Sequence, residues 1–429
     1  MKAYKNMSKD ELLALKEELT KAFEDAKGKG LKLDMSRGKP TPKQLDLSME
    51  MLDILPSDCD YKTEAGTDTR NYGVLDGIPE AKSLMGEIMG IPADNVIVCG
   101  NASLPIMYDC VSRSMVFGVC GKTPFMKQEK LKFLCPAPGY DRHFRITETF
   151  GFEMITIPMV EGGPDMDMVE EYVNNDPTVK GIWCVPKYSN PLGTTYSDET
   201  VRRFAALNPA ADDFRIYWDN AYAVHHLYEE KDKQDQLLNL YEELKKNGKE
   251  DLLLEFASTS KVTFAGAGIG AVGASDANIA WIKKTMTVQT IGYDKMNMLR
   301  HVRYLKNLAG VEKHMMRHAE LMRPKFEAVL DVFDRELSGL EIGTYTRPRG
   351  GYFISFDTLP GCAKAVVEKC KEAGVTLTGA GATFPYGKDP KDTNIRIAPS
   401  FPTPEEMAAA ADLFVLCVKL VTVEKLLAE

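Results

Sequence analysis

The sequence predicts an α/β fold with a mostly parallel sheet, and three features support this prediction. Short β-rich runs recur between residues 95 and 273, and most are separated by segments long enough for a helix. The runs are almost continuously apolar, which is typical of parallel strands buried on both faces. After about residue 300 strands and helices segregate, which predicts a separate, smaller α+β domain. The runs are Asn95–Cys99, Lys132–Cys135, Met154–Pro158, Gly181–Val185, Arg215–Trp218, Leu252–Phe256 and Ala271–Gly273.

The length of 429 residues is too great for one simple core, so we expect a division into domains. Residues 1–60 are predicted to form an N-terminal segment that packs with the smaller domain. Residues 61–305 are predicted to form the large domain, with a seven-stranded sheet, and residues 306–429 the smaller one.

Helix signals mark both ends of the chain. Ser8 and Glu11 form a predicted capping box for a helix that ends near Gly28, and Thr403 and Glu406 form another for a terminal helix. Further predicted elements are a helix at 235–246 within a charged insertion at 226–251, a long helical stretch that includes residues 303–318, strands at 352–356, 375–377 and 394–398, and an end of the terminal helix near Leu427.

The composition excludes several classes of protein. With 44% hydrophobic and 27% charged residues, the chain is typical of a globular protein, and its net charge of −9 argues against a nucleic-acid footprint. The nine cysteines are scattered, without a C-x-x-C pair, which favours reduced thiols, and no metal-ligand spacing is visible. Because no apolar leader and no run of 18 apolar residues occur, we expect a cytoplasmic protein without a membrane segment.

Lys261 stands out among the residues that follow the predicted strands. It lies between the apolar run 252–256 and a glycine-rich segment, residues 265–273. A lysine is costly to place there unless its charge is neutralised or consumed, and an imine with an aldehyde cofactor would consume it. The alternative interpretation is a solvated lysine at a strand end.

Other strand ends carry residues suited to a ligand, since ligands of such sheets bind beyond the carboxyl ends of the strands. Asn101-Ala102-Ser103 opens a predicted helix and suits a phosphate, although many such turns are simple caps. Asp219 follows a buried strand, where a protonated ring nitrogen or a structural partner would satisfy its carboxylate. Tyr140 can stack on a planar ligand or fill the sheet edge, and Asn190 can donate to an oxygen.

Four motifs, in this order and spacing, resemble those of the class I/II aminotransferases of pyridoxal 5′-phosphate (PLP) fold type I. They are Ser36-Arg37-Gly38-Lys39-Pro40, Asn190-Pro191-x-Gly193, Asp219-x-x-Tyr222 and Ser258-x-Ser260-Lys261. The first also resembles the bacterial aspartate aminotransferase subgroup related to the aminotransferase part of MocR-type regulators. The resemblance covers roughly Leu31 to Leu420.

The resemblance implies a cofactor site for PLP. Lys261 would form the internal aldimine and move the substrate proton, and Asp219 would pair with the pyridinium nitrogen. Asn190 and Tyr222 would form hydrogen bonds with the phenolic oxygen of PLP. Tyr140 would stack on the ring, and Ser260 is a further implied cofactor contact. The implied phosphate contacts are Asn101, Ala102, Ser103 and Ser258, with Tyr72 reaching the phosphate from a second subunit of a homodimer.

The resemblance also implies a substrate site for an amino acid and a 2-oxo acid. Arg396 would bind the α-carboxylate, and alternation with Ile395 and Ile397 in a strand suits such a clamp, although a surface arginine is the alternative. Asn190, Gly38 and Arg37 would line the substrate. In the dicarboxylate-specific members of that family an arginine of the partner subunit binds the second carboxylate, and Arg37, Lys295 and Arg300 are the candidates for this role here.

One position departs from the family pattern. Ile269 stands where many relatives carry an arginine that contacts the phosphate. We expect backbone N–H groups of Gly266, Gly268 and Gly270 to replace that arginine.

The predicted function is a PLP-dependent aminotransferase that moves an amino group, most simply from L-aspartate to 2-oxoglutarate, in two half-reactions. Alternatives are alanine or aromatic specificity, a PLP lyase or decarboxylase, and a PLP-sensing regulatory module like the MocR-type factors. Only one amphipathic helix and no basic recognition helix precede Leu33, so DNA binding is not expected.

Overall fold

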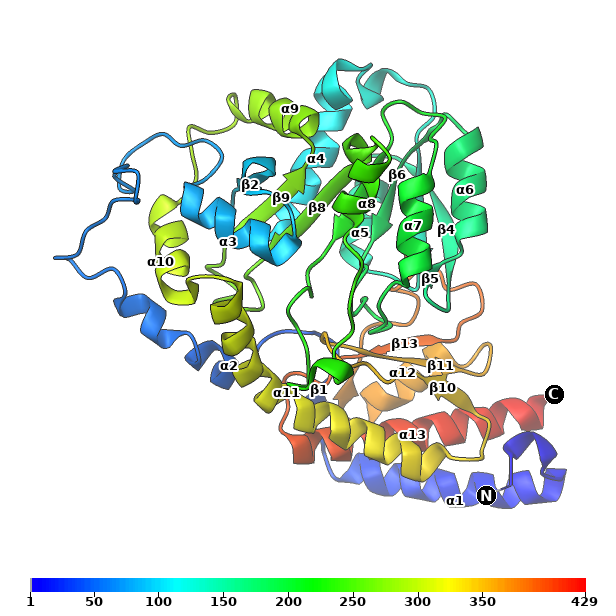
Figure 1. Ribbon diagram of the computed structural model, residues 1–429. Helices are drawn as coiled ribbons and strands as arrows, with labels where there is room; N and C mark the ends of the chain where they lie inside the picture. The colour runs from blue at the N-terminus through cyan, green and yellow to red at the C-terminus, as the bar shows by residue number, and fades with distance from the viewer. Residues whose placement is uncertain (1) are drawn as a thin grey trace.

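The larger part of the protein is built on an eight-stranded sheet with strand order β2-β9-β8-β7-β6-β3-β4-β5, shown in Figure 1. The computed structural model describes residues 2–429. Strands β3, β4, β6, β7 and β8 are parallel, and β9 runs antiparallel to both of its neighbours. The strands are β2 (Val96–Val98), β3 (Lys132–Ala137), β4 (Glu153–Val160), β5 (Gly163–Pro164), β6 (Val179–Cys184), β7 (Arg215–Asp219), β8 (Leu253–Ser258) and β9 (Gly270–Ala274).

All seven predicted runs form strands of this sheet, which confirms the mostly parallel α/β prediction. The eighth strand, β5, is a two-residue return that pairs with the end of β4. It was not predicted because a Gly-Pro pair carries no β-rich pattern.

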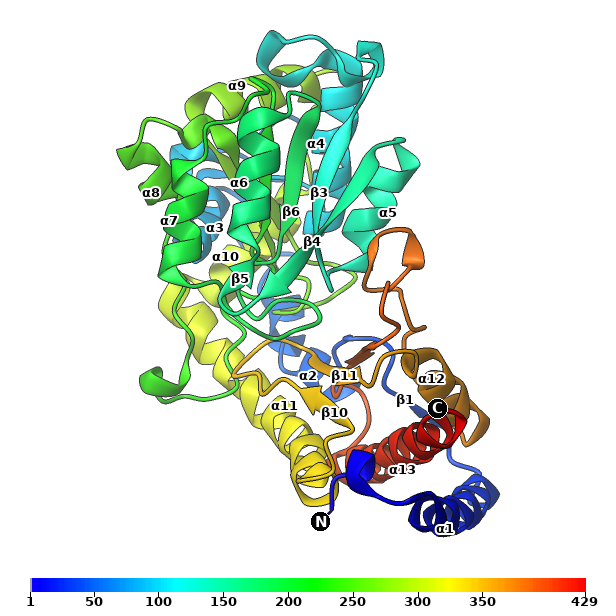
Figure 2. The ribbon, with the colours of Figure 1, turned by 90° about the vertical axis from the view of Figure 1, so that its right-hand side faces the viewer.

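Helices cover both faces of the sheet, as Figure 2 shows for α6 and α7 on one side and α4 and α5 on the other. Side chains within a strand alternate between the two layers: Ile216 and Trp218 pack in one core, and Tyr217 between them packs in the other. The helices are α3 (Pro79–Met89), α4 (Ser103–Phe117), α5 (Asp141–Thr149), α6 (Met166–Asn175), α7 (Asp198–Ala206), α8 (Leu240–Lys246), α9 (Asp276–Met286) and α10 (Lys295–Leu305).

A smaller α+β unit lies beside the large sheet and contains both chain termini (Figure 1). Its strands form an antiparallel sheet, β10-β11-β13, and a parallel pair, β1-β12. Leu12, Leu19 and Phe23 of the N-terminal helix share one core with Phe414 and Val418 of the last helix. The elements are α1 (Lys9–Gly28), β1 (Leu33–Asp34), α2 (Pro42–Asp46), α11 (Leu308–Leu337), β10 (Gly343–Tyr345), β11 (Ile354–Thr358), α12 (Ala363–Glu372), β12 (Val375–Thr376), β13 (Asn394–Ile397) and α13 (Pro404–Ala428).

Helix α11 connects the two units. Val311 and Met315, in its first half, pack with Leu84 of the larger unit, whereas Met322 and later residues belong to the core of the smaller one. The domain boundaries at 60/61 and 305/306 stay predictions.

Both predicted capping boxes are present. Ser8 Oγ accepts from the backbone N–H of Glu11 and the Ser8 N–H donates to the Glu11 carboxylate, and Thr403 and Glu406 make the same exchange. These reciprocal bonds satisfy the free N–H groups of the first helical turn.

Several predicted boundaries were wrong. Helix α8 begins at Leu240 rather than Asp235, because Asn239 caps it and the Asp235 carboxylate instead accepts from Thr195 Oγ1 at 2.9 Å. The long helical stretch is interrupted at Lys306, whose φ of 68° ends α10 before Asn307 caps α11. Strand β11 begins two residues later than predicted, at Ile354.

Two negative findings hold for the part of the chain from residue 2 onward. No helix there is long and apolar enough to cross a membrane. No group of three or more His, Cys, Asp or Glu residues there is placed to hold a metal ion.

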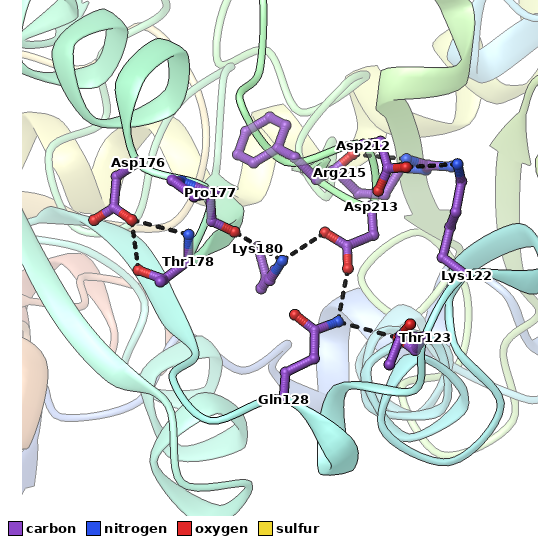
Figure 3. Close-up of polar contacts among 11 residues, drawn as sticks. Lys122, Thr123, Gln128, Asp176, Pro177, Thr178, Lys180, Asp212, Asp213 and Arg215 are labelled. Carbon is purple, nitrogen blue, oxygen red and sulfur yellow. Dashed lines mark hydrogen bonds and ion pairs between the residues drawn. The ribbon is translucent and has the colours of Figure 1, made fainter.

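A buried ion pair lies at the end of the sheet where the central strands β6 and β7 begin (Figure 3). Lys180 Nζ lies 2.8 Å from Asp213 Oδ1, and the two residues are 5% and 4% exposed. Gln128 Nε2 donates to Asp213 Oδ2 at 2.9 Å, and Lys180 also donates to the Pro177 carbonyl at 2.8 Å. The preceding residue, Asp212, is also an aspartate, but it forms its ion pair with Lys122 at the surface.

Asp213→Asn is expected to lower the free energy of unfolding by about 3–5 kcal/mol, because it leaves the Lys180 ammonium buried without a counter-ion. The matched control is Asp212→Asn, which removes a solvated ion pair and is expected to change the free energy of unfolding far less. Urea unfolding followed by tryptophan fluorescence measures both. Equal losses in the two variants would show that burial does not determine the effect.

Candidate functional site

A cavity of about 600 Å³ lies where the parallel strands of the large sheet end, between that sheet and the smaller unit. Residues that follow β2, β3, β6, β7 and β8 meet there with residues of the β1 loop, β12 and β13. The lining is Ser36, Arg37, Gly38, Ala102, Ser103, Leu104, Met107, Tyr140, Asp141, Arg142, Val185, Asn190, Asp219, Ala221, Tyr222, Ser258, Ser260, Lys261, Ala265, Phe353, Thr378 and Arg396.

Lys261 reaches this cavity from a tight turn after β8. The N–H groups of Val262 and Thr263 both donate to the Thr259 carbonyl at 2.9 Å, and Thr259 itself is fully buried. Lys261 Nζ lies 4.8 Å from the ring centre of Tyr222 and 5.7 Å from that of Tyr352. The ammonium group therefore rests against aromatic faces, which attract a cation without fixing it in an ion pair.

Asp219 ends β7 and is 3% exposed. His143 Nε2, from α5, lies 2.9 Å from Asp219 Oδ2, and the His143 ring stacks on Trp183 at 4.5 Å. Asp219 Oδ1 is buried and has no hydrogen-bond partner among residues 2–429. An unpartnered carboxylate oxygen is costly, and a protonated ring nitrogen in the cavity would satisfy it.

The N-terminus of α4 gives the cavity an anion-binding wall. Ala102 is its N-cap residue and supplies no side-chain cap, so backbone N–H groups of the first turn stay available. Ser103, Ser258 and Ser260 add hydroxyl groups to the lining. Ser258 Oγ donates to Ser260 Oγ at 3.1 Å, which holds the two hydroxyls side by side.

Tyr140, Asn190 and Tyr222 line the cavity, as their positions after strands predicted. Burial raises the pKa of Tyr140 to about 12 and also raises the pKa of Tyr222, so both phenols stay protonated and can donate. Asn190 Oδ1 accepts from an Arg396 guanidinium N–H at 3.2 Å, which leaves the amide N–H groups of Asn190 for a ligand.

Arg396 projects from β13 and is 8% exposed. One terminal nitrogen donates to Asn190 and Asp141, each at 3.2 Å, and the other donates to Thr378 Oγ1 at 3.1 Å. Its Nε is buried without a partner within the described chain. The guanidinium can therefore still donate hydrogen bonds to a bound carboxylate.

The loop before α2 closes the cavity on the side of the smaller unit. A Cβ atom on Gly38 would lie 2.6 Å from Phe353 Cζ, so glycine allows the loop to pack on that ring. Arg37 lines the cavity beside it and is exposed at the entrance.

Several predicted residues lie outside the cavity lining. Asn101 contributes only its carbonyl, which accepts from Ser260 Oγ at 3.4 Å. Tyr72 is 83% exposed and lines a separate groove with Lys295. Because neither Lys295 nor Arg300 lines the cavity of this chain, the structure does not support them as carboxylate anchors within one subunit.

The prediction that glycine N–H groups replace the missing arginine was wrong for Gly270, whose N–H donates to the Gly100 carbonyl at 3.2 Å. Gly266 and Gly268 do not line the cavity either, and Ile269 is 1% exposed. The hydrogen-bond donors that the structure places at this wall of the cavity are the α4 N-terminus and the serine hydroxyls.

Sequence reasoning missed Asp141, Arg142, His143, Phe353 and Thr378. The first three lie in the first turn of α5, directly after Tyr140, where a helix start at a strand end is the available signal. Phe353 and Thr378 come from the smaller unit and carry no local signal.

The charged insertion does not line the cavity. Residues 237–240 instead border a second cavity of about 200 Å³, which also contacts Lys187, Asn220 and Glu255. Burial raises the pKa of Glu255 to about 8, and Asn220 Nδ2 donates to its carboxyl at 2.9 Å.

Comparison with known proteins places the chain in a well-defined group. The sequence model of a family described as aspartate amino-transferase matches residues 7–429. An aspartate aminotransferase of Corynebacterium glutamicum is 45% identical over 409 residues, which are 95% of this chain and 94% of that protein.

Solved structures show the same fold. The crystal structure of an aspartate transaminase from Corynebacterium glutamicum superimposes with a TM-score of 0.95, at 43% identity, over 99% of each chain. The α-aminoadipate aminotransferase LysN from Thermus thermophilus, complexed with N-(5′-phosphopyridoxyl)-L-leucine, gives a TM-score of 0.73 at 19% identity, over 91% of this chain and 93% of that one.

Proposed function

The chain belongs to the aspartate amino-transferase family and is an aminotransferase, and we propose that it uses PLP to move an amino group from L-aspartate to 2-oxoglutarate. The observation that carries the proposal is the meeting of Lys261, Asp219 and Arg396 in one cavity. An amine, a buried carboxylate and a guanidinium are the groups needed to react with, hold and orient an amino acid on an aldehyde cofactor.

The residues of the cavity fit PLP. The unpartnered Asp219 Oδ1 suits a protonated ring nitrogen, and the uncapped N-terminus of α4 suits a phosphate. The phosphopyridoxyl ligand of the Thermus thermophilus relative, which has the same fold, supports this choice. Ser103, Ser258 and Ser260 would bind the phosphate, and Tyr140 would lie against the ring.

The residues that line the cavity would then each have a defined role in the reaction. When bound, PLP would supply an aldehyde carbon and an electron-withdrawing ring. Asp219 would keep a proton on the ring nitrogen, because a carboxylate favours a positive charge beside it. Lys261 Nζ would take up the proton that leaves the substrate Cα and release it again, which one amine can do as base and acid. Arg396 would bind the α-carboxylate, and Asn190 and Tyr222 would donate to the phenolic oxygen.

A dicarboxylic substrate needs a second cation, and we propose Arg142 together with Arg37. Both line the cavity, and neither makes an ion pair with another residue in the described range. Arg142 follows Asp141, whose carboxylate accepts from Arg396 at 3.2 Å, in the first turn of α5. Arginine suits this role because its planar guanidinium binds a carboxylate with two parallel bonds.

A homodimer with shared sites is also proposed, together with a cytoplasmic location. Tyr72, Val288 and Ile291 are 83%, 79% and 64% exposed, which is unusual for large apolar side chains of a monomer. The Tyr72 groove also contains Gly292 and Lys295, and Gly292 directly follows Ile291 in the chain. The nine free cysteines support a reducing compartment.

The function is tested by following the absorption of the PLP-loaded protein. L-aspartate alone is expected to bleach the visible band, 2-oxoglutarate to restore it, and glutamate to accumulate. Lys261→Ala is expected to lower turnover at least about 10²-fold, because the proton-transfer group is lost. Lys284→Ala, at an exposed lysine on α9, is the control. A response only to alanine or aromatic donors, or release of ammonia or carbon dioxide, would contradict the proposal.

Arg142→Leu and Arg37→Leu test the second anchor. Each is expected to raise the KM for aspartate and 2-oxoglutarate about 10- to 100-fold and to leave alanine unaffected, since a charged hydrogen bond contributes about 1.5–3 kcal/mol. The matched control is Arg145→Leu, one turn further along α5, where the arginine is exposed and paired with Glu148. Unchanged kinetics in both test variants would place the anchor elsewhere.

Sedimentation is expected to give twice the chain mass of 47.7 kDa. Tyr72→Phe is expected to preserve that mass but to raise the PLP concentration for half-saturation about tenfold, through loss of one bond to a charged phosphate. Tyr108→Phe, at a tyrosine of α4 packed on Phe150, is the control. A monomer at micromolar concentration would contradict the shared site.

A further inference from the structure

Three buried histidines lie on the side of the Lys261 turn that faces away from the cavity. His301 comes from α10, and His314 and His318 come from α11; their exposed fractions are 0%, 5% and 2%. None of them lines the cavity, and no step of the proposed reaction uses them. Burial lowers the pKa of His301 to about 4 and that of His318 to about 3, and it also lowers the pKa of His314, so the rings are neutral at pH 7.

His314 forms a hydrogen bond to the backbone of Val262, the residue after Lys261. Its Nε2 lies 2.8 Å from the Val262 carbonyl, which can only accept, so Nε2 carries the proton and donates. The bond comes from a side chain because the backbone turns at Thr259–Thr263 rather than continuing as a helix. A buried carbonyl without a donor is unfavourable.

His301 holds the next residue, Thr263. His301 Nδ1 lies 2.8 Å from the Asn297 carbonyl and must donate to it, so Nε2 of the neutral ring is an acceptor. The Thr263 hydroxyl, 2.8 Å from Nε2, therefore donates to His301. Two consecutive residues after Lys261 are thus bonded to two different helices.

His318 continues this layer toward the aromatic wall behind Lys261. Gln44 Nε2 can only donate, so His318 Nδ1, 3.3 Å away, accepts from it, and Nε2 of the neutral ring carries the proton. That Nε2 lies 3.2 Å from His314 Nε2, and both rings donate toward the Val262 carbonyl. The same Gln44 amide donates to Tyr352 OH at 3.2 Å, and the Tyr352 ring faces Lys261 Nζ. One connected set of hydrogen bonds therefore supports both the turn that carries Lys261 and a ring against which its ammonium rests.

We propose that His314 and His301 are positioning residues for Lys261, fixing the turn that carries it so that its side chain points into the cavity. They touch neither the cavity nor Lys261 Nζ, so their effect passes through Val262 and Thr263. The consequence of loosening such a turn is large, because misplacing a reacting group by about 1 Å can cost about 10²-fold in rate. This inference rests on the proposed role of Lys261 in transamination.

The test compares His314→Leu, which removes the donor, with His314→Gln, whose side-chain N–H can replace it. The apoprotein is labelled with pyridoxal and borohydride: the lysine amine condenses with the aldehyde, water leaves, and hydride reduces the C=N bond. Peptide mass spectrometry then gives the labelling rate at Lys261, with exposed Lys284 in the same sample as the internal control. Labelling requires no turnover, so it is independent of whether aspartate is the substrate.

His314→Leu is expected to slow labelling of Lys261 about tenfold or more relative to Lys284 and to lower kcat more than it raises KM, whereas His314→Gln stays within about twofold of the wild type. Thr263→Val against Thr263→Ser gives a second pair, which decides the question if His314→Leu does not fold. Wild-type labelling in both His314→Leu and Thr263→Val, or equal losses within each pair, would overturn the proposal.

Discussion

The hydrogen bond between His143 and Asp219 is the interaction on which the site depends. It holds the carboxylate at the end of β7 through one oxygen and leaves the other buried without a partner in the described chain. Such an arrangement is unfavourable in the protein alone, since a buried polar atom without a partner costs free energy. The stacking of His143 on Trp183 and the closed core around β7 keep the carboxylate in place despite this cost. Residues at functional sites often accept such a cost in return for binding a ligand.

The cavity exists because two units of different architecture share it. The large sheet supplies the amine, the carboxylate and the helix N-terminus, all beyond strand ends where parallel strands bring distant residues together. The smaller unit supplies Arg396, Thr378 and Phe353, and the Gly38 loop packs on Phe353 without a side chain between them. The cofactor-type groups therefore come from the large sheet, whereas the substrate-type groups come from both units, and α11 packs in both units and fixes how they meet.

Three neutral histidines form buried hydrogen bonds near Lys261. His301, His314 and His318 are all buried and bond to side-chain or backbone groups of the surrounding turns. A neutral imidazole can donate at one nitrogen and accept at the other, so it joins two partners without adding charge. That property suits a region where a lysine ammonium and an arginine already contribute positive charge.

The sequence by itself determined seven of the eight strands of the large sheet and both capping boxes, because hydrophobic periodicity and local motifs act over a few neighbouring residues. It also singled out Lys261, Asp219 and Asn190 at strand ends and Arg396 within a strand. It placed the start of α8 too early and did not predict the break at Lys306, since a cap and a positive φ depend on what surrounds them. Only the tertiary structure brought Arg142 and Thr378 to the cavity, paired His143 with Asp219, kept Tyr72 at the surface and set His314 behind Lys261. These contacts join residues tens to hundreds of positions apart, and their burial and hydrogen bonds come into existence only when the sheet, α11 and the smaller unit have packed together.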